Sequence, residues 1–197
     1  MLTKHMCTCS LDLIKNNLEG RESLNYATIK YCDISNGPGV RTSLYVSGCT
    51  HHCKHCFNPM TWDFGYGKLF DETIEEQIME SLKPEYISGF SLLGGEPMEI
   101  VNQRVLFPFV KKVKERFPNK TIWCYSGYTY EELMDSQNGR CHCEVTEELL
   151  RCVDVLVDGE FVQDLYDISL QFRGSSNQRL IDLERTRQAG KIICWEA

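Results

Sequence analysis

The sequence lacks long apolar runs: nowhere in its 197 residues does an uninterrupted apolar stretch reach membrane-spanning length. A transmembrane helix needs about 20 predominantly apolar residues, so we expect no membrane span and no membrane partner. The first twenty residues carry a polar side chain every few positions and hold no apolar segment typical of a signal peptide. They predict neither a secretion signal nor a membrane anchor, and we therefore expect a cytoplasmic protein.

Concentrated positive charge is also missing. The formal net charge is −7, and the densest group of Lys and Arg is the short stretch at 110–117. Proteins that bind nucleic acid need a basic surface that displaces counterions from the phosphates. The composition therefore argues against a nucleic-acid partner and favours proteins or small molecules as partners.

The sequence does not have the features of a disulfide framework, although it contains eleven cysteines. The number is odd, and no secretion signal accompanies it. Structural disulfides belong to oxidising compartments, whereas clustered cysteines in a reducing cytosol are typical of metal ligation. We therefore expect some of these thiols to bind a metal or a metal cluster.

Strand patterns alternate with helix patterns along most of the chain. Residues 1–24 look like an N-terminal extension, and two β segments flank a turn at Asn36–Gly39. Further on we predict helices at 71–83, 105–117 and 128–136, with Pro108 in the first turns of the second, and strands at 86–93, 120–127 and 153–159. Such alternation predicts an α/β fold with parallel strands and right-handed crossovers, here one domain at 25–182. Residues 183–197 form a tail with one more β segment at 191–196.

Four unusual segments each follow the carboxyl end of a predicted strand. They are the cysteine-rich stretch GCTHHCKHCFN at 48–58, GGEP at 94–97, YSGYT at 125–129 and DGEF at 158–161. In parallel αβ barrels and sheets, binding sites are built at this rim. We therefore expect all four segments to contribute to one shared site.

The cysteine-rich stretch has the spacing C-x3-C-x2-C, at Cys49, Cys53 and Cys56. Structural zinc sites usually take two short Cys/His pairs, and no second pair follows at the usual distance, although a neighbouring histidine could be a fourth ligand. Three thiolates can instead hold three irons of a [4Fe–4S] cube and leave the fourth iron open. S-adenosylmethionine can bind that iron through its amino and carboxylate groups. We favour the cluster and keep zinc as the alternative.

These residues resemble a known family. CTHHCKHC and GGEP are similar to two motifs of the radical S-adenosylmethionine superfamily. The segments SNGPGVRTSLYVSGC, CFNPMTW, GGEP, WCYSGYTYEEL, VDVLVDGEFVQDL and FRGSSNQRLID resemble, in that order, the activating enzymes of anaerobic (class III) ribonucleotide reductases. The resemblance extends from about Tyr26 to about Asp182. It implies a truncated parallel (βα) barrel of the radical S-adenosylmethionine type.

The resemblance also implies an activity. Such an enzyme cleaves S-adenosylmethionine reductively on its cluster, and the resulting 5′-deoxyadenosyl radical takes the α-hydrogen of one glycine in the partner reductase. The expected partners are therefore the glycyl-radical subunit of an anaerobic ribonucleotide reductase and an electron donor such as reduced flavodoxin. Activation of another glycyl-radical enzyme, of the pyruvate formate-lyase type, is a second possibility, and a non-catalytic zinc-binding module is a third.

Site residues follow from the resemblance position by position. Cys49, Cys53 and Cys56 would ligate the cluster. Contacts to S-adenosylmethionine would come from His55, Phe57, Gly94, Gly95, Glu96 and Ser126. His55 stands where the family often has an aromatic residue. The segments Asp158–Phe161 and Arg173–Gln178 would form the rim that meets the partner.

The other cysteines and several large side chains are open to simpler interpretations. Small buried hydrophobic roles are expected for Cys32, Cys124, Cys152 and Cys194. Packing roles are expected for Trp62 and Trp123, while Arg41 could pair with a ligand carboxylate or form a surface salt bridge. Cys7, Cys9, Cys141 and Cys143 form two thiol pairs that could jointly bind zinc, although we expect a structural role for them.

Overall fold

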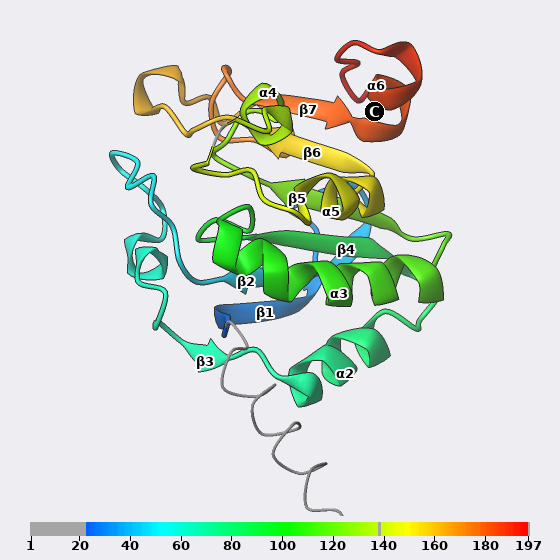
Figure 1. The fold of residues 1–197 in the computed structure, drawn as a ribbon. Helices are drawn as coiled ribbons and strands as arrows, with labels where there is room; N and C mark the ends of the chain where they lie inside the picture. Colours follow the sequence, from blue (N-terminus) through cyan, green and yellow to red (C-terminus); the bar gives the residue numbers. More distant parts are fainter. Residues whose placement is uncertain (1–22, 138, 197) are drawn as a thin grey trace, which may run out of the picture.

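The computed structural model describes residues 23–137 and 139–196, and these form one seven-stranded sheet with helices (Figure 1). The strands lie in the spatial order β3 (Lys68–Leu69), β1 (Asn25–Asp33), β2 (Val40–Val46), β4 (Ile87–Gly94), β5 (Thr121–Tyr125), β6 (Val155–Asp158) and β7 (Arg179–Asp182). The four central strands, from β2 to β6, are mutually parallel, as the alternating pattern predicted. The structure is therefore a mixed α/β fold with its parallel part in the middle.

Antiparallel strands occupy both edges of the sheet. β1 pairs antiparallel with β2 and β3, and β7 pairs antiparallel with β6. The short turn between β1 and β2 enforces this direction, because a parallel pair needs a longer crossover. Gly37 and Gly39 have φ values of 121° and 73° in this turn, a region that favours glycine. The strand β7 was not predicted from the sequence.

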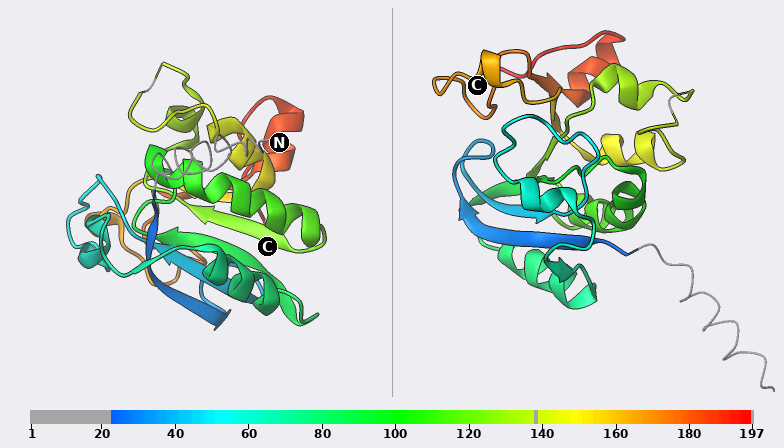
Figure 2. Two further views of the ribbon diagram at one scale, coloured as in Figure 1. Left: turned by 60° about the horizontal axis from the view of Figure 1, so that its bottom comes forward. Right: turned by 90° about the vertical axis from the view of Figure 1, so that its left-hand side faces the viewer.

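The α-helices are α2 (Glu72–Ser81), α3 (Ile100–Arg116), α4 (Tyr130–Met134), α5 (Thr146–Cys152) and α6 (Leu183–Ala189); short 3-10 turns lie at η1 (Pro59–Trp62) and η2 (Gln163–Leu165). Side-chain caps fix three helix starts, and at α6 Asp182 accepts a hydrogen bond from the backbone N–H of Arg185. Asp71 accepts a hydrogen bond from the backbone N–H of Ile74, and Thr129 and Glu132 form a reciprocal capping box. Helices α2, α3 and α5 lie on the same face of the sheet (Figure 2).

The secondary structure differs from the sequence prediction in three places. Pro108 lies in the middle of α3 rather than in its first turns, because α3 begins five residues earlier than predicted. The polar stretch before β6 contains the unpredicted helix α5. The tail begins with helix α6, and its predicted β segment makes only an isolated bridge, between Ile181 and Cys194. Helices were predicted mainly from apolar residues that repeat at helical spacing over several turns. The helices α5 and α6 have only seven residues each, which is too short to show such a repeat.

The two faces of the sheet have different cores. On the helix-covered face, a large apolar cluster joins the sheet to the helices through residues such as Phe90, Leu92, Leu106, Phe109 and Ile122. A smaller cluster comprises Trp123, Val155, Val157 and Leu180, packed against Tyr125, Phe172 and Trp195. Because side chains alternate along a strand, Trp123 and Ile122 must project to opposite faces. The smaller cluster therefore covers the face without long helices and confirms Trp123 as a packing residue.

Arg41 lies under this smaller cluster and is fully buried, so the prediction of a surface salt bridge was wrong. Its guanidinium donates to Ser91, Thr121 and the carbonyls of Pro38, Phe90 and Thr121. It also lies over the ring of Trp123, 5.6 Å from the centroid. Burial lowers the pKa of Arg41 to about 10, so it remains charged at neutral pH. Arg41 is thus an internal brace between β2, β4 and β5.

The additional cysteines differ in exposure. Cys124 is fully buried and Cys152 is half-buried, in line with small hydrophobic roles. Cys32 and Cys194 are exposed, so the prediction that they are buried was wrong. Cys32 belongs to β1 near the edge of the sheet, where one neighbour is only a two-residue strand, and Cys194 lies in the irregular tail. Burial there depends on covering elements that the sequence does not reveal.

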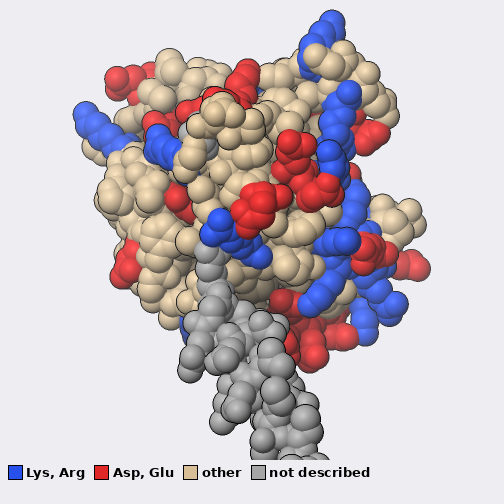
Figure 3. Space-filling model, viewed as in Figure 1, with Lys and Arg blue, Asp and Glu red and all other residues tan. Residues whose placement is uncertain are grey.

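The surface carries mixed charge. Figure 3 shows Lys and Arg groups lying beside Asp and Glu groups over the helix-covered face. Oppositely charged side chains form ion pairs such as Arg104–Glu144 and Lys112–Glu75. Within the described part of the chain, no helix has the length and apolar character required to cross a bilayer.

Candidate active site

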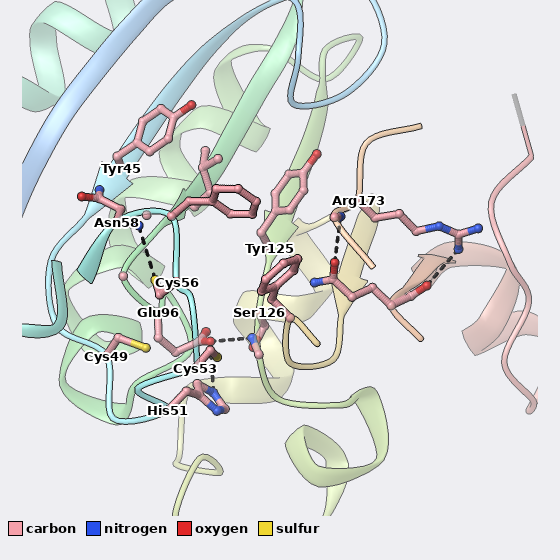
Figure 4. A pocket seen from close by; sticks show the side chains of 18 of the residues that line it. Tyr45, Cys49, His51, Cys53, Cys56, Asn58, Glu96, Tyr125, Ser126 and Arg173 are labelled. Atoms are coloured by element: carbon pink, nitrogen blue, oxygen red, sulfur yellow. Dashed lines mark hydrogen bonds and ion pairs between the residues drawn. The ribbon is translucent and has the colours of Figure 1, made fainter. Parts of the chain in front are cut away.

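A pocket of about 490 Å³ lies at the carboxyl ends of β2, β4, β5 and β6 (Figure 4). All four segments that the sequence analysis placed on one rim contribute to its lining. Of the expected site residues, the pocket is lined by Cys49, Cys53, Cys56, Phe57, Gly94, Gly95, Glu96 and Ser126. His55 is exposed and does not line it. From the expected rim, Gly159, Phe161, Arg173, Gly174 and Gln178 reach the pocket wall.

The cysteine segment leaves β2 through a sharply bent backbone. Gly48 has a φ of 93°, and its N–H donates to the carbonyl of Thr61 at 2.8 Å. Two histidines that follow, His52 and His55, also have positive φ values, 52° and 61°. Non-glycine residues rarely adopt this conformation, and it tends to persist at functional sites. The bends direct the Cys49, Cys53 and Cys56 side chains toward one pocket.

Burial affects the protonation of the thiols. It raises the pKa of Cys49 to about 12. The pKa of Cys53 is also raised, first by burial and then by the nearby Glu160 carboxylate and Cys56 thiol, while a backbone hydrogen bond of Phe161 acts in the opposite direction. These thiols are therefore protonated at neutral pH until a cation binds and displaces the proton.

The donor set suits an iron–sulfur cluster. Three thiols from one short segment face one pocket, and iron–sulfur clusters are held by cysteine thiolates. A cube takes one thiolate per iron, so the three sulfurs need not converge on a point. Across residues 23–137 and 139–196, no three His, Cys, Asp or Glu side chains lie in positions to hold a single metal ion.

Glu96 is an internal link as well as a pocket residue. It is 1% exposed, and its two carboxylate oxygens accept hydrogen bonds from the backbone N–H groups of Met98 at 2.8 Å and Gly127 at 2.6 Å. These bonds join the end of β4 to the end of β5. The resemblance implied a contact from Glu96 to S-adenosylmethionine, and the structure adds an internal role that the motif alone did not reveal.

The two glycines of GGEP are required by close packing. Gly94 has a φ of 114°, and a β-carbon there would lie 2.6 Å from backbone atoms of Val46. A β-carbon on Gly95 would lie 2.6 Å from the carbonyl oxygen of Gly48. The end of β4 thus lies directly against the start of the cysteine segment, where any side chain would separate the two.

Several residues that hold the site were missed by sequence reasoning. Thr50 donates its N–H and its hydroxyl to Glu99 Oε1, both at 2.7 Å. Asn102 Nδ2 donates to the carbonyls of Ser47 at 3.0 Å and Glu96 at 2.9 Å, and Asn102 is buried. The available signal was the polar residues Glu99 and Asn102 at the start of α3, shortly after GGEP. These bonds fix the first half of the cysteine segment to α3.

A polar region lies at the opposite end of the pocket. Asn36 donates to Tyr45 Oη at 2.9 Å and to Asp33 Oδ2 at 2.6 Å. Tyr125 lines the pocket nearby, and its buried hydroxyl has no hydrogen-bond partner within the described residues. Burial raises the pKa of Tyr125 well above its usual value, so it stays protonated and able to donate. The pocket therefore offers thiols at one end and uncharged hydrogen-bonding groups at the other.

Comparison with known proteins agrees with this chemistry. Residues 35–181 match the family model described as a 4Fe-4S single cluster domain. The chain is 43% identical to a protein of Haemophilus influenzae over 157 residues, which cover 79% of this chain and 96% of that protein. It is 40% identical to a protein of Escherichia coli K12, with the same 79% coverage of this chain and 96% of that protein. Identity to a protein of Enterobacteria phage T4 is 38%, covering 80% of this chain and 93% of that protein.

All three relatives are called anaerobic ribonucleoside-triphosphate reductase-activating protein. The match covers most of both chains in each comparison, and the residues matched by the family model, 35–181, include every residue that lines the pocket. The chain belongs to the family of anaerobic ribonucleoside-triphosphate reductase-activating proteins, which carry a 4Fe-4S single cluster domain.

Proposed function

We propose that this protein activates an anaerobic ribonucleotide reductase by generating a glycyl radical on it, using a [4Fe–4S] cluster and S-adenosylmethionine. The observation that carries the proposal is the pocket in which Cys49, Cys53 and Cys56 face the two glycines of GGEP. The names of the relatives support the partner, and the 4Fe-4S family match supports the cluster. When bound, the cluster supplies the electron that cleaves the sulfonium, and the nucleoside radical then takes a hydrogen atom from glycine.

In this proposal, Cys49, Cys53 and Cys56 hold the cluster through their thiolates. The exposed backbone of Gly94 and Gly95 binds the amino group of S-adenosylmethionine, because a carbonyl oxygen accepts from an ammonium. Ser126 lies at the end of β5 on the pocket wall and contributes a further hydroxyl, and Glu96 contributes negative charge. The exposed His55 is the least supported of the proposed contacts, because it does not line the pocket.

The pocket mouth is suited to a protein partner. Phe57 is 76% exposed, and its ring centroid lies 5.1 Å from that of Phe161 and 6.4 Å from that of Tyr166. Exposed aromatic groups beside a pocket favour contact with another chain, since they lose water when covered. The segments Asp158–Phe161 and Arg173–Gln178 would therefore meet the glycine-bearing loop of the reductase.

The finer description of the fold belongs to the same proposal. The helices gather on one face of the sheet, and the pocket opens on the other side of the strand ends, an arrangement compatible with a truncated (βα) barrel. We place the catalytic domain at 25–182, the cytoplasm as its location and a reduced flavodoxin-type protein as its electron donor. The domain core extends slightly past both bounds, because Leu24 and Leu183 belong to its apolar cluster.

The test begins with anoxic reconstitution using iron and sulfide, followed by reductant and S-adenosylmethionine. Formation of 5′-deoxyadenosine and methionine is expected from the wild-type chain and not from Cys53→Ser. A glycyl-radical EPR signal is expected only when the anaerobic reductase is added. A chain with a full cluster that produces no 5′-deoxyadenosine would overturn the proposal.

The same experiment decides between partners and between metals. Presenting a pyruvate formate-lyase type enzyme in place of the reductase should give no glycyl signal. A signal there, with none on the reductase, would reassign the partner. Colourless protein with stoichiometric zinc after anoxic purification would instead support the zinc-binding module.

A further inference from the structure

His51 stands between the first two cysteines of the motif and has an unusual environment. Its side chain is only 3% exposed. Nδ1 lies 2.7 Å from Glu160 Oε1, in the segment after β6, and Nε2 lies 3.4 Å from Glu96 Oε2, in the segment after β4. A single imidazole thus lies between two carboxylates from different strand ends.

The ring is also enclosed by the segment after β5. A β-carbon on Gly127 would lie 2.7 Å from two atoms of the His51 ring, so only glycine leaves room for it. The ring packs against Tyr128 with centroids 4.3 Å apart, and the Arg140 guanidinium lies over the Tyr128 ring with one nitrogen 3.5 Å from His51 Nδ1. His51 therefore contacts the segments that follow β4, β5 and β6.

In the following half of the cysteine segment, the backbone of Phe161 interacts with the Cys53 thiol, but the segment's own backbone has few partners among the described residues. Thr50 is fixed to Glu99 and residues 47–48 are fixed to Asn102. Beyond His51, the hydrogen bonds of the cysteine backbone are local: Cys56 N–H donates to the carbonyl of Cys53, and Asn58 N–H to the sulfur of Cys56. His51 is therefore positioned where the anchored half of the segment passes into the half that carries Cys53 and Cys56.

We propose that His51, clamped by Glu160 and enclosed by Glu96 and Gly127, is a positioning residue that sets the placement of the Cys53 and Cys56 thiolates on the cluster. The inference rests on the proposed function, since it assumes that these cysteines hold a [4Fe–4S] cluster. Residues that orient metal ligands through hydrogen bonds typically change metal affinity 10- to 100-fold when removed. In this protein, His51 would orient the backbone next to the ligands rather than a ligand itself. Its carboxylate partner, Glu160, comes from a distant segment of the chain.

The test compares His51→Phe and Glu160→Ala with Glu160→Gln, which keeps an acceptor for the imidazole N–H. His52→Asn is the matched control: His52 is the neighbouring histidine, is exposed and stacks on Trp62 rather than on a carboxylate. Each full-length variant is reconstituted without oxygen. Iron and sulfide content, the rate of iron loss to a chelator, and the midpoint potential and EPR line shape of the reduced cluster are then measured.

We expect iron loss from His51→Phe to be about tenfold faster than from the wild type, with an altered EPR line shape and a shifted potential. Glu160→Ala should show a smaller change in the same direction, and Glu160→Gln should restore behaviour within about twofold of the wild type. In the double variant His51→Phe/Glu160→Ala, the two effects should not add, because both remove the same contact. His52→Asn should match the wild type.

Iron loss, potential and line shape of His51→Phe within twofold of the wild type would overturn the inference. Additive effects of His51 and Glu160 would do so as well, since they would show that the pair does not act through one contact. Failure of the proposed function gives a different result: the wild-type chain itself would then take up no cluster. If the His51 and Glu160 variants only destabilised the fold, the cluster-free variants would unfold at a lower temperature than the cluster-free wild type, and the EPR line shape of the cluster would be unchanged.

Discussion

Two cysteine-rich segments of this chain have very different surroundings. At residues 49–56 the thiols face one pocket, and the backbone around them is bent to keep them there. At residues 141–143 each side chain already has an internal hydrogen-bond partner. The Cys141 thiol is buried and donates to the carbonyl of Glu132, Cys143 Sγ lies within hydrogen-bonding distance of Gln103 and Thr146, and His142 Nδ1 bonds the carbonyl of Leu133.

The comparison shows that a Cys-x-Cys pair is not a metal site by composition alone. A thiol can share a metal only if it faces an open space together with a neighbouring ligand. In the second segment, the side chains of Cys141 and His142 instead form hydrogen bonds with carbonyl groups of α4. The suggested zinc site also required Cys7 and Cys9, which lie outside the described residues, so that suggestion is still untested.

The largest effect is expected from replacing a thiol of the first segment. Cys53→Ser should reduce the iron bound after anoxic reconstitution to a small fraction of the wild-type amount, because a hydroxyl is a poor ligand in a thiolate-held cluster. Iron and sulfide analysis with visible absorbance measures this. Retention of a full cluster by Cys53→Ser would contradict both the assigned ligand and the comparison.

The matching change in the second segment should leave the amount of bound iron unchanged. Cys141→Ala removes a small, fully buried side chain, and we expect a loss of about 1 kcal/mol in the free energy of unfolding. Urea denaturation of the cluster-free chain measures this loss. Iron content equal to that of the wild type is the expected control result, and zinc that disappears in this variant would show that the second segment is a metal site after all.

The pocket region should be sensitive to a single methyl group. Gly127→Ala places a β-carbon against the His51 ring at a separation that real structures avoid. We expect about 1–3 kcal/mol of destabilisation from this overpacking and a several-fold faster loss of iron to a chelator. Gly139→Ala is the control, because no described atom lies within 4 Å of its added carbon. Equal stability and equal rates of iron loss in the two variants would show that the His51 ring has space to move.

The smallest effect is expected at low pH, beside the second segment. A hydrogen bond from Arg179 lowers the pKa of Glu131 on α4 below its usual value of 4.5. The stabilisation from this carboxylate is therefore present above about pH 4.5 and is lost as pH falls through the lowered folded-state pKa. Chemical denaturation from pH 6 to pH 3 should show a slightly smaller decline for Glu131→Gln than for the wild type. An identical decline would mean that solvent screens the pair completely.

Much of the site could be predicted because it depends on local sequence. The spacing of Cys49, Cys53 and Cys56 and the two glycines of GGEP are visible within a few residues, and the parallel strands follow from alternating periodicities. The contacts of His51 could not be predicted in this way, since Glu96 and Glu160 are 45 and 109 positions away from it and belong to other strand ends. Nothing in the motif distinguishes His51 from the exposed His52 beside it.

Residues close together in the sequence were enough to indicate the class of chemistry: three clustered thiols without the features of a disulfide framework, and a glycine-rich turn, in an acidic chain. The three-dimensional arrangement was needed to see which of the described cysteines share a space, why Arg41 is buried and which histidine lies between two carboxylates. The physical reason is that ligand type and local backbone freedom are properties of neighbouring residues. Burial, charge pairing and close packing, in contrast, arise only when strands distant in the sequence end at the same edge of the sheet.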